Sequence, residues 1–173
     1  GLTTTVTFRN PGAAGPRTVT LEAVPEQESF RFTSVYRGYV APDLPLDYRF
    51  LDSGYGYIRI SSYADDLNLI VRLFERALKA FEANGVTGLI VDLRYNDGGN
   101  PLGLAGFLTD AVIPLGQELR YSEQTGGFEP VGTPRKILPN QTQYRFDQIA
   151  VLVRPACFSA CEAEAYGFSQ LPG

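Results

Sequence analysis

The sequence predicts an α/β fold in which buried strands and helices form layers around a core. Residues 65–83 carry apolar side chains at three- and four-residue steps, which is the period of an amphipathic helix. Residues 86–93 then form a nearly continuous apolar run of strand length, a pattern typical of a strand buried on both faces. A helix followed directly by such a strand favours an α/β core over a sandwich of two sheets.

The chain opens with two β-rich runs, residues 3–9 and 17–24, which a Gly/Pro cluster separates. Such a pattern predicts a hairpin or two neighbouring strands over residues 1–25. Residues 26–55 are mixed in character and contain several prolines, so they predict a connector with little regular structure. The layered core is expected over residues 56–173.

Within this core, strands and helices are expected to alternate along the chain. Asp65 and Asp66 lie in the first turn of the helix over 65–83, where the helix dipole favours anions, and Asn84 with Gly85 supplies a stop signal. The other elements are segments of strand or helix character between Gly and Pro residues. They are a strand over 56–60, a second helix over 101–110, short β pieces within 117–146, a buried strand over 149–153 and a final helix over 160–168.

Composition excludes several kinds of active site and partner. No histidine occurs among the 173 residues, so this segment alone cannot build a Ser-His-Asp triad, a Cys-His pair or a His-rich zinc site. A net charge of −4 argues against a nucleic-acid-binding surface. The apolar runs fall far below the roughly 20 residues that a membrane-spanning helix needs. We therefore expect neither a nucleic-acid partner nor a membrane span.

The two cysteines, Cys157 and Cys161, stand four residues apart. Without histidine or a second pair of cysteines they make a poor metal site. A disulfide at this spacing would need a particular local backbone. The sequence therefore favours two small apolar side chains near a helix start. It does not decide whether the protein resides in an oxidising or a reducing compartment.

Two places resemble strand-to-helix elbows, where α/β proteins direct backbone amides and side chains at ligands. The first follows the strand over 86–93 and contains Gly98 and Gly99. Paired glycines allow positive φ angles and outward-facing N–H groups, which could form half of an oxyanion hole. The structural alternative is a plain Gly-rich turn beside an ion pair between Asp92 and Arg94, and the local pattern alone favours it.

The second elbow lies between the strand over 149–153 and the final helix, and it contains Ser159. A serine there has a helix N-terminus beneath it, which favours a nearby anion, and the amide of Ala160 could be a further oxyanion donor. The structural alternative makes Ser159 a helix cap, with Glu162 completing a capping box. A lone serine in this setting is more often a cap.

Taken in order, these segments resemble the carboxyl-terminal processing peptidases, an S41-type serine peptidase family related to the tricorn core. The resemblance rests on GYGYIRISSY, the helix over 65–83, VTGLIVDLRYNDGG and IAVLVRPACFSACEAEAYGF, and it covers residues 56–168. It implies a ClpP/crotonase-like layered core, here incomplete. Residues 1–25 resemble the last strands of the PDZ-like domain that often precedes this core.

The resemblance also implies roles for individual residues. Ser159 falls on the nucleophile of the family, and Ala160 with Gly98 or Gly99 falls on the oxyanion hole. Cys161 stands where the family commonly has a serine of no catalytic role. No metal or organic cofactor is implied, and the substrate is expected to be a protein gripped near its carboxyl end as an added β-strand.

The general base is the main departure from the family pattern. The family usually places a lysine roughly 25 residues after the nucleophile, the Ser-Lys variation on the triad, and that position lies beyond Gly173. Lys136 lies in a proline-flanked loop, where a desolvated, neutral amine is not expected, and Lys79 is expected to be a solvated surface charge. We therefore expect this segment by itself to be inactive.

Two other functions fit the same residues. A non-catalytic relative could bind peptides or small apolar ligands, and a crotonase-like domain with another activity would also explain the Gly-Gly loop. Relatives are commonly exported, so a periplasmic or cell-envelope location is the default expectation. The unpaired strand edges expected of an incomplete core also favour a homo-oligomer or strand exchange.

Overall fold

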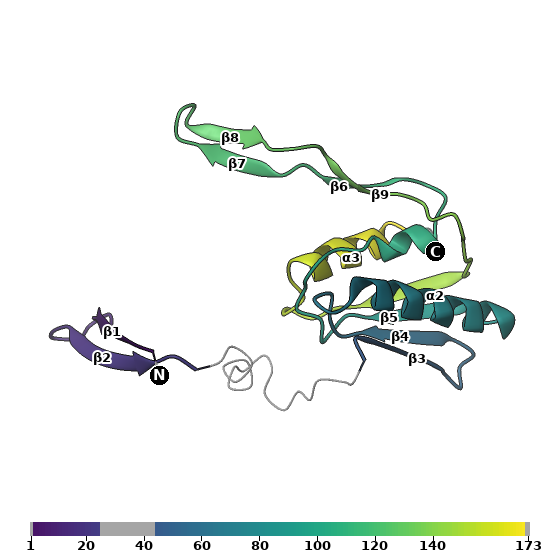
Figure 1. The fold of residues 1–173 in the computed structure, drawn as a ribbon, viewed down its shortest axis with the longest axis horizontal. Coiled ribbons are helices and arrows are strands. Elements are labelled where there is room, and N and C mark those ends of the chain that lie inside the picture. Colours follow the sequence, from purple (N-terminus) through teal and green to yellow (C-terminus); the bar gives the residue numbers. More distant parts are fainter. Residues whose placement is uncertain (1, 25–43, 172–173) are drawn as a thin grey trace. The chain divides into compact units, whose positions relative to one another are not determined.

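The computed structural model describes residues 2–24 and 44–171, which belong to two separate units (Figure 1). In the first unit, strands β1 (Thr3–Phe8) and β2 (Arg17–Glu22) pair antiparallel, which confirms the predicted hairpin. Almost all of their side chains are exposed. The assignment of this hairpin to a PDZ-like domain stays a prediction. The part of the predicted connector over 26–43 lies outside the described residues.

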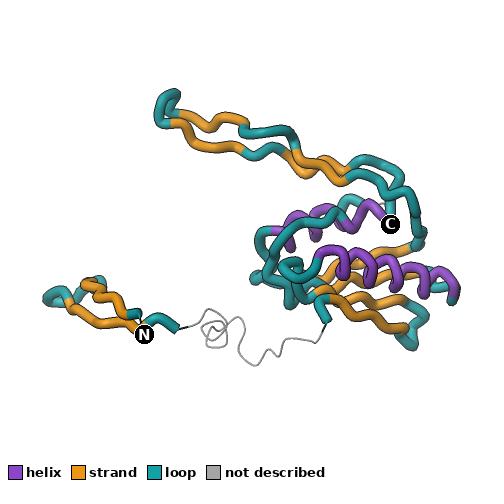
Figure 2. Tube along the Cα trace, viewed as in Figure 1, coloured by secondary structure: helices purple, strands orange, loops and turns teal. Residues whose placement is uncertain are grey.

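A four-stranded sheet forms the centre of the second unit, in the order β10-β5-β4-β3 (Figures 1 and 2). The first three strands are parallel, and β3 joins the edge of the sheet antiparallel to β4. β3 lies within the predicted connector, where its short run of mixed residues gives no clear strand signal. The strands are β3 (Leu46–Phe50), β4 (Gly56–Ile60), β5 (Gly88–Asp92) and β10 (Gln148–Leu152).

Helices α2 (Leu67–Ala83) and α3 (Ala160–Ser169) pack against this sheet and against each other. The side chain of Asp66 caps α2 by accepting hydrogen bonds from the first-turn amides. The Phe74 ring of α2 lies 6.1 Å from the Phe168 ring of α3, so the two helices share one apolar core. The combination of parallel strands and packed helices confirms the predicted α/β class.

Strand β5 is buried more fully on one face than on the other. Leu89 and Val91 point toward the helices and are almost completely buried. On the opposite face Ile90 is partly exposed, and the carboxylate of Asp92 binds the side chains of Tyr57 and Arg94. The prediction of burial on both faces is therefore true of this strand only in part, because Ile90 on the second face remains partly exposed.

Residues 101–110 form only a short 3-10 helix, η1 (Leu104–Phe107), where the sequence predicted a longer helix. Gly103 precedes η1 with a φ of 69°, a left-handed conformation that interrupts a helical path. Gly106 lies against the backbone of Leu138, whose carbonyl oxygen would be 2.3 Å from a Cβ added at Gly106. Close packing with a distant segment thus decides the local structure here.

Residues 113–137 form a two-stranded arm, in the region where the sequence predicted short β pieces. Ile113 and Ile137 at its base are buried in the core, whereas Tyr121 and Phe128 toward its tip are 55% and 70% exposed. The strands are β6 (Ile113–Gly116), β7 (Leu119–Ser122), β8 (Gly127–Pro130) and β9 (Arg135–Ile137), paired antiparallel as β6 with β9 and β7 with β8.

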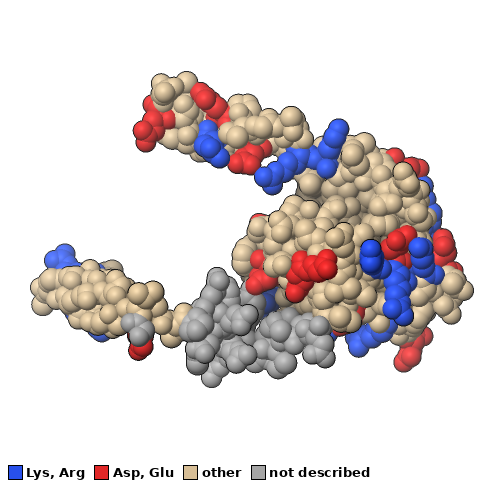
Figure 3. Space-filling view, viewed as in Figure 1, with Lys and Arg blue, Asp and Glu red and all other residues tan. Residues whose placement is uncertain are grey.

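The charged side chains of the second unit are mixed in sign over its visible surface (Figure 3). This distribution agrees with the modest net charge of the chain, −4. None of the helices in the described ranges has both the length and the apolar character that a membrane crossing requires.

Candidate active site

Both predicted elbows leave the same edge of the sheet. In the parallel pair β5 and β10, Asp92 lies opposite Leu152, and the amide of Leu93 donates to the carbonyl oxygen of Leu152 at 2.8 Å. The segments that follow β5 and β10 therefore leave the sheet side by side at the carboxyl ends of these strands. Open parallel sheets place their ligand sites at this edge. The segment after β5 leads into the Gly98-Gly99 loop, and the segment after β10 leads to Ser159.

Ser159 adopts an unusual backbone at the start of α3. Its φ is 59° and its ψ is −125°, and among the described residues no other non-glycine has a positive φ. An L-residue reaches such angles only at a cost in free energy, and residues of this kind cluster at functional sites. Ser159 is also exposed to solvent. A strained, exposed serine between a parallel strand and a helix fits the geometry of a nucleophile elbow.

The capping interpretation of Ser159 is correct as well. The N–H of Ser159 donates to Oε2 of Glu162 at 2.9 Å, within the capping box that the sequence predicted. The carboxylate of Glu162 is thereby fixed beside the first turn of α3. The N–H of Ala160 comes next in the chain, and no acceptor among the described residues takes its hydrogen bond.

Asn96 shapes the glycine loop, and the sequence analysis did not single it out. Its side chain is buried, donates through Nδ2 to the carbonyl oxygen of Ile60 at 3.3 Å, and accepts through Oδ1 from the N–H of Gly98 at 2.8 Å. The amide of Gly98 is therefore already occupied. An Asn followed two residues later by Gly is a common turn signal, which is the only sequence pattern that could have indicated this role.

The backbone of Tyr63 holds the other side of the glycine loop. The N–H of Tyr63 donates to the carbonyl oxygen of Gly98 at 3.0 Å, and its carbonyl oxygen accepts from Asn100 at 2.9 Å. This is the pattern of a parallel bridge between Tyr63 and Gly99. In such a bridge the N–H and C=O of Gly99 itself point away from Tyr63, and within the described ranges the Gly99 N–H has no acceptor.

The two elbows touch each other through Gly98. A Cβ placed on Gly98 would lie 2.8 Å from the carbonyl oxygen of Phe158, 3.0 Å from Cβ of Ser159 and 3.4 Å from the amide nitrogen of Ala160. Only a residue without a side chain fits this approach. The structure thus brings together the four residues that the sequence analysis selected for the site: Gly98, Gly99, Ser159 and Ala160.

Cys157 and Cys161 form a disulfide across the serine elbow, with an S–S distance of 2.06 Å. The sequence interpretation as two unlinked apolar side chains was therefore wrong. The unusual backbone at Ser159 lets the chain fold back within one turn, so the two Cα atoms come within 5.3 Å of each other. The Cys161 sulfur also lies 3.7 Å from the carbonyl oxygen of Leu93, a packing contact, since a disulfide sulfur carries no hydrogen.

The predicted ion pair between Asp92 and Arg94 is present. Asp92 lies on the face of β5 opposite to Leu89 and Val91. Arg94 contacts Asp92 at 2.7 Å, and Tyr57 donates its hydroxyl hydrogen to the same carboxylate at 2.6 Å. Burial opposes ionisation of Asp92, but the hydrogen bonds from Arg94 and Tyr57 outweigh it and hold the pKa of Asp92 below its ordinary value. This group braces the end of β5.

Both lysines of the chain are exposed to solvent. Lys79 on α2 forms an ion pair with Glu75 at 3.0 Å, and this contact raises the pKa of Lys79 above its ordinary value, so the amine stays protonated. Lys136 lies on β9 in the arm and is exposed. Lys79 lies on α2 and Lys136 on β9, so neither lysine lies on one of the two elbows.

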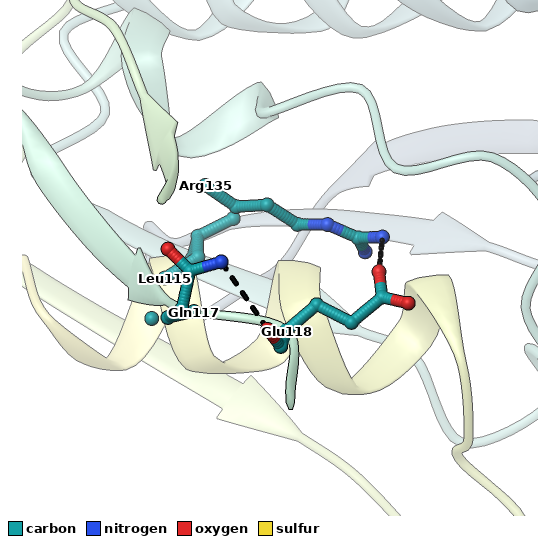
Figure 4. Close-up of a pocket in the computed structure, with 5 residues that line it drawn as sticks. Leu115, Gln117, Glu118 and Arg135 are labelled. Carbon is teal, nitrogen blue, oxygen red and sulfur yellow. Dashed lines mark hydrogen bonds and ion pairs between the residues drawn. The ribbon is translucent and has the colours of Figure 1, made fainter. Parts of the chain in front are cut away.

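A hollow of about 350 Å³ lies on the arm rather than at the elbows (Figure 4). Its polar side chains already pair with their neighbours: Arg135 contacts Glu118 at 3.0 Å, and Gln117 donates to the carbonyl oxygen of Val131 at 2.8 Å. A ligand site needs convergent polar groups that are free to bind. This hollow does not provide them, so Ser159 remains the centre of the candidate site.

Comparison with known proteins identifies relatives of this fold. A candidate peptidase from Parabacteroides merdae matches with a TM-score of 0.57 and 22% identity, over 80% of this chain and 44% of that one. The photosystem II D1 C-terminal processing protease matches with a TM-score of 0.53 and 20% identity, over 95% of this chain and 40% of that one. The chain thus spans less than half the length of these two structures. A comparison with curated proteins found no match.

The sequence profile described as Peptidase family S41 matches residues 54–171, which is more than half of the chain. The matched range contains both elbows and the helix α2 before them. It agrees with the resemblance inferred from the order of the motifs. The chain belongs to peptidase family S41.

Proposed function

We propose that this chain is the nucleophile-bearing part of a serine endopeptidase that cleaves proteins near their carboxyl ends. The observation that carries the proposal is the exposed Ser159, in a strained backbone at a helix start, directly against Gly98. Membership of peptidase family S41 supports the reaction class. The resemblance to carboxyl-terminal processing peptidases supports the preference for chain ends.

In the proposed reaction, Oγ of Ser159 attacks the carbonyl carbon of the scissile peptide bond while a general base removes the hydroxyl proton. The base then returns this proton to the leaving amine as the C–N bond breaks, and an acyl-enzyme remains. Water, deprotonated by the same base, then attacks the ester carbonyl. The base returns this proton to Oγ of Ser159 as the ester C–O bond breaks, and the new carboxyl terminus is released. The oxyanion of each tetrahedral intermediate needs two N–H donors.

The donors best suited to this task are the amides of Ala160 and Gly99. Both lack an acceptor among the described residues, whereas the amide of Gly98 already donates to Asn96. The contribution of Gly98 is its missing side chain, which lets the loop approach the serine elbow. This division refines the sequence prediction, which left Gly98 and Gly99 as alternatives.

The general base comes from outside the described residues, and the family pattern indicates a lysine. The substrate strand is proposed to lie beside Gly99, whose N–H and C=O face away from Tyr63 and so offer a strand-like edge. The Cys157–Cys161 disulfide supports an oxidising compartment, such as the periplasm or the outer face of the cell envelope.

Labelling of the full-length protein with a serine-directed fluorophosphonate tests the proposal. We expect one labelled site in the wild-type protein and none in Ser159→Ala, with cleavage of an unfolded protein substrate lost in the same variant. Labelling and cleavage that survive in Ser159→Ala would refute it. The isolated 173-residue segment is expected to show no cleavage.

A binding module of the same fold is the second candidate. It is favoured by one observation, that both lysines of this segment are exposed and lie on elements other than the two elbows. In that case the wild-type protein would bind an extended peptide with equal affinity before and after Ser159→Ala substitution, and the phosphonate would not react.

A further inference from the structure

The side chain of Glu164 is a buried carboxylate that neither the family resemblance nor the capping of α3 explains. It lies on α3, five positions after Ser159, and only 1% of its surface is exposed. A buried, uncompensated carboxylate costs several kcal/mol, so its partners must account for its presence. All of its hydrogen-bond partners come from another segment of the chain.

Three consecutive backbone amides converge on this carboxylate. Oε1 accepts from Leu102 at 2.6 Å and from Gly103, and Oε2 accepts from Leu104 at 3.0 Å. The left-handed backbone of Gly103 turns the neighbouring N–H groups toward one point, as in the anion-binding nests of other proteins. Here the anion is a side chain of the protein itself.

The segment held by Glu164 begins three residues after Gly99. The glycine loop is therefore fixed at two places: by the Tyr63 bridge at Gly98 and Asn100, and by Glu164 just beyond it. Helix α3 carries Ser159 at its start and the Glu164 carboxylate in its second turn. One rigid helix thus positions the nucleophile and also binds the chain that follows the oxyanion loop.

We propose that Glu164 is a positioning residue that sets the distance between Ser159 and the amide of Gly99. Its carboxylate ties residues 102–104 to α3 through three backbone amides, so the glycine loop cannot move away from the serine elbow. The expected loss of reaction rate rests on the proposed function. The expected coupling of Glu164 to the backbone of Gly98 and Gly99 does not depend on that function.

The test uses the full-length protein and three variants. Glu164→Gln keeps the shape of the side chain but replaces one oxygen by an NH₂ group, which would face a backbone N–H. Glu164→Asp keeps the charge on a shorter stem. Glu82→Gln is the matched control, because it makes the same chemical change on an exposed carboxylate of α2.

Two measurements are made on the folded proteins: amide hydrogen exchange over residues 96–104, and the fluorophosphonate reaction separated into its binding constant and its maximal rate. For Glu164→Gln we expect faster exchange that includes Gly98 and Gly99. We also expect a roughly tenfold lower maximal rate at unchanged phosphonate binding, since small displacements of reacting groups are costly. Glu164→Asp should recover part of the rate, and Glu82→Gln should match the wild type.

Faster exchange confined to residues 102–104, with an unchanged maximal rate, would overturn the inference and leave Glu164 as a local anchor only. If Glu164→Gln does not fold, the same two measurements on Glu164→Asp decide between a positioning residue and a local anchor. If the wild-type protein does not react with the phosphonate, the proposed function fails. Exchange at Gly98 and Gly99 in the variants still decides whether Glu164 positions the loop.

Discussion

The glycines of the candidate-site loop and those of the arm share positive φ angles but differ in what surrounds them. Gly99 at the loop and Gly126 at the arm both have positive φ angles, 128° and 68°. A Cβ on Gly99 would lie 2.2 Å from the carbonyl carbon of Tyr63, whereas one on Gly126 would meet nothing within 4 Å. Glycine in the arm therefore serves only the turn, while glycine at the site also makes room for a close backbone contact.

The same contrast holds for the apolar side chains of the two regions. Phe74 of α2 and Phe168 of α3, the helices beside the candidate site, are almost fully buried, whereas Phe128 in the arm is 70% exposed. The site region is thus held by packing, hydrogen bonds and a disulfide. The arm is held mainly by its own strand pairing, which is weak in an isolated pair of strands.

The largest effect is expected from Gly99→Ala. The new methyl group overlaps the backbone of Tyr63, and the residue must also hold a strained φ, so the loop has to move away from Ser159. We expect the rate of phosphonate labelling in the full-length protein to fall by roughly a hundredfold, as for other displaced reacting groups. Gly126→Ala is the matched control and should label at the wild-type rate. Equal labelling rates in Gly99→Ala and Gly126→Ala would show that the close contact of Gly99 with Tyr63 does not matter for the reaction.

An intermediate effect is expected from the double variant Cys157→Ala/Cys161→Ala. The chain-entropy estimate for a loop this short gives a loss of about 2 kcal/mol in the free energy of unfolding. Denaturant unfolding of oxidised wild type and variant measures the difference. Reduction should destabilise the wild-type protein by a similar amount and leave the variant unchanged. A variant as stable as the oxidised wild type would show that the serine elbow needs no cross-link.

The smallest effect is expected from Phe128→Ser in the arm. Because the ring is mostly exposed, the free energy of unfolding should change by less than about 0.5 kcal/mol. Denaturant unfolding of the full-length protein gives the value, and Phe74→Ser, in the core, provides the opposite extreme. A loss well above 1 kcal/mol for Phe128→Ser would mean that another part of the full-length protein covers the arm.

The sequence predicted the elements that have strong local patterns. The apolar stripe of α2, the apolar run of β5 and the glycine and serine elbows each depend on neighbouring residues, and all appear in the structure. Both interpretations of Ser159 proved compatible, since one residue can cap a helix and occupy an elbow. Local patterns thus located the candidate site to within a few residues.

Features that depend on distant contacts could not be predicted in the same way. Glu164 binds backbone amides about sixty positions earlier, and backbone amides have no sequence signature. The disulfide depends on the φ of Ser159, which residue types do not reveal. The helix expected over 101–110 is reduced to η1, where Gly103 has a left-handed backbone and Gly106 lies against Leu138, a contact outside any local window.

The pairing of β10 with β5 has a consequence for the timing of activity. These strands are adjacent in space but separated in sequence by η1 and the whole arm, so their pairing is a non-local contact of the kind that forms slowly during folding. Ser159 cannot face the glycine loop until this parallel pair has closed. Under the proposed function, a growing chain on the ribosome would carry the proposed nucleophile, Ser159, apart from the proposed oxyanion loop, and newly made protein would be inactive until this strand pair has formed.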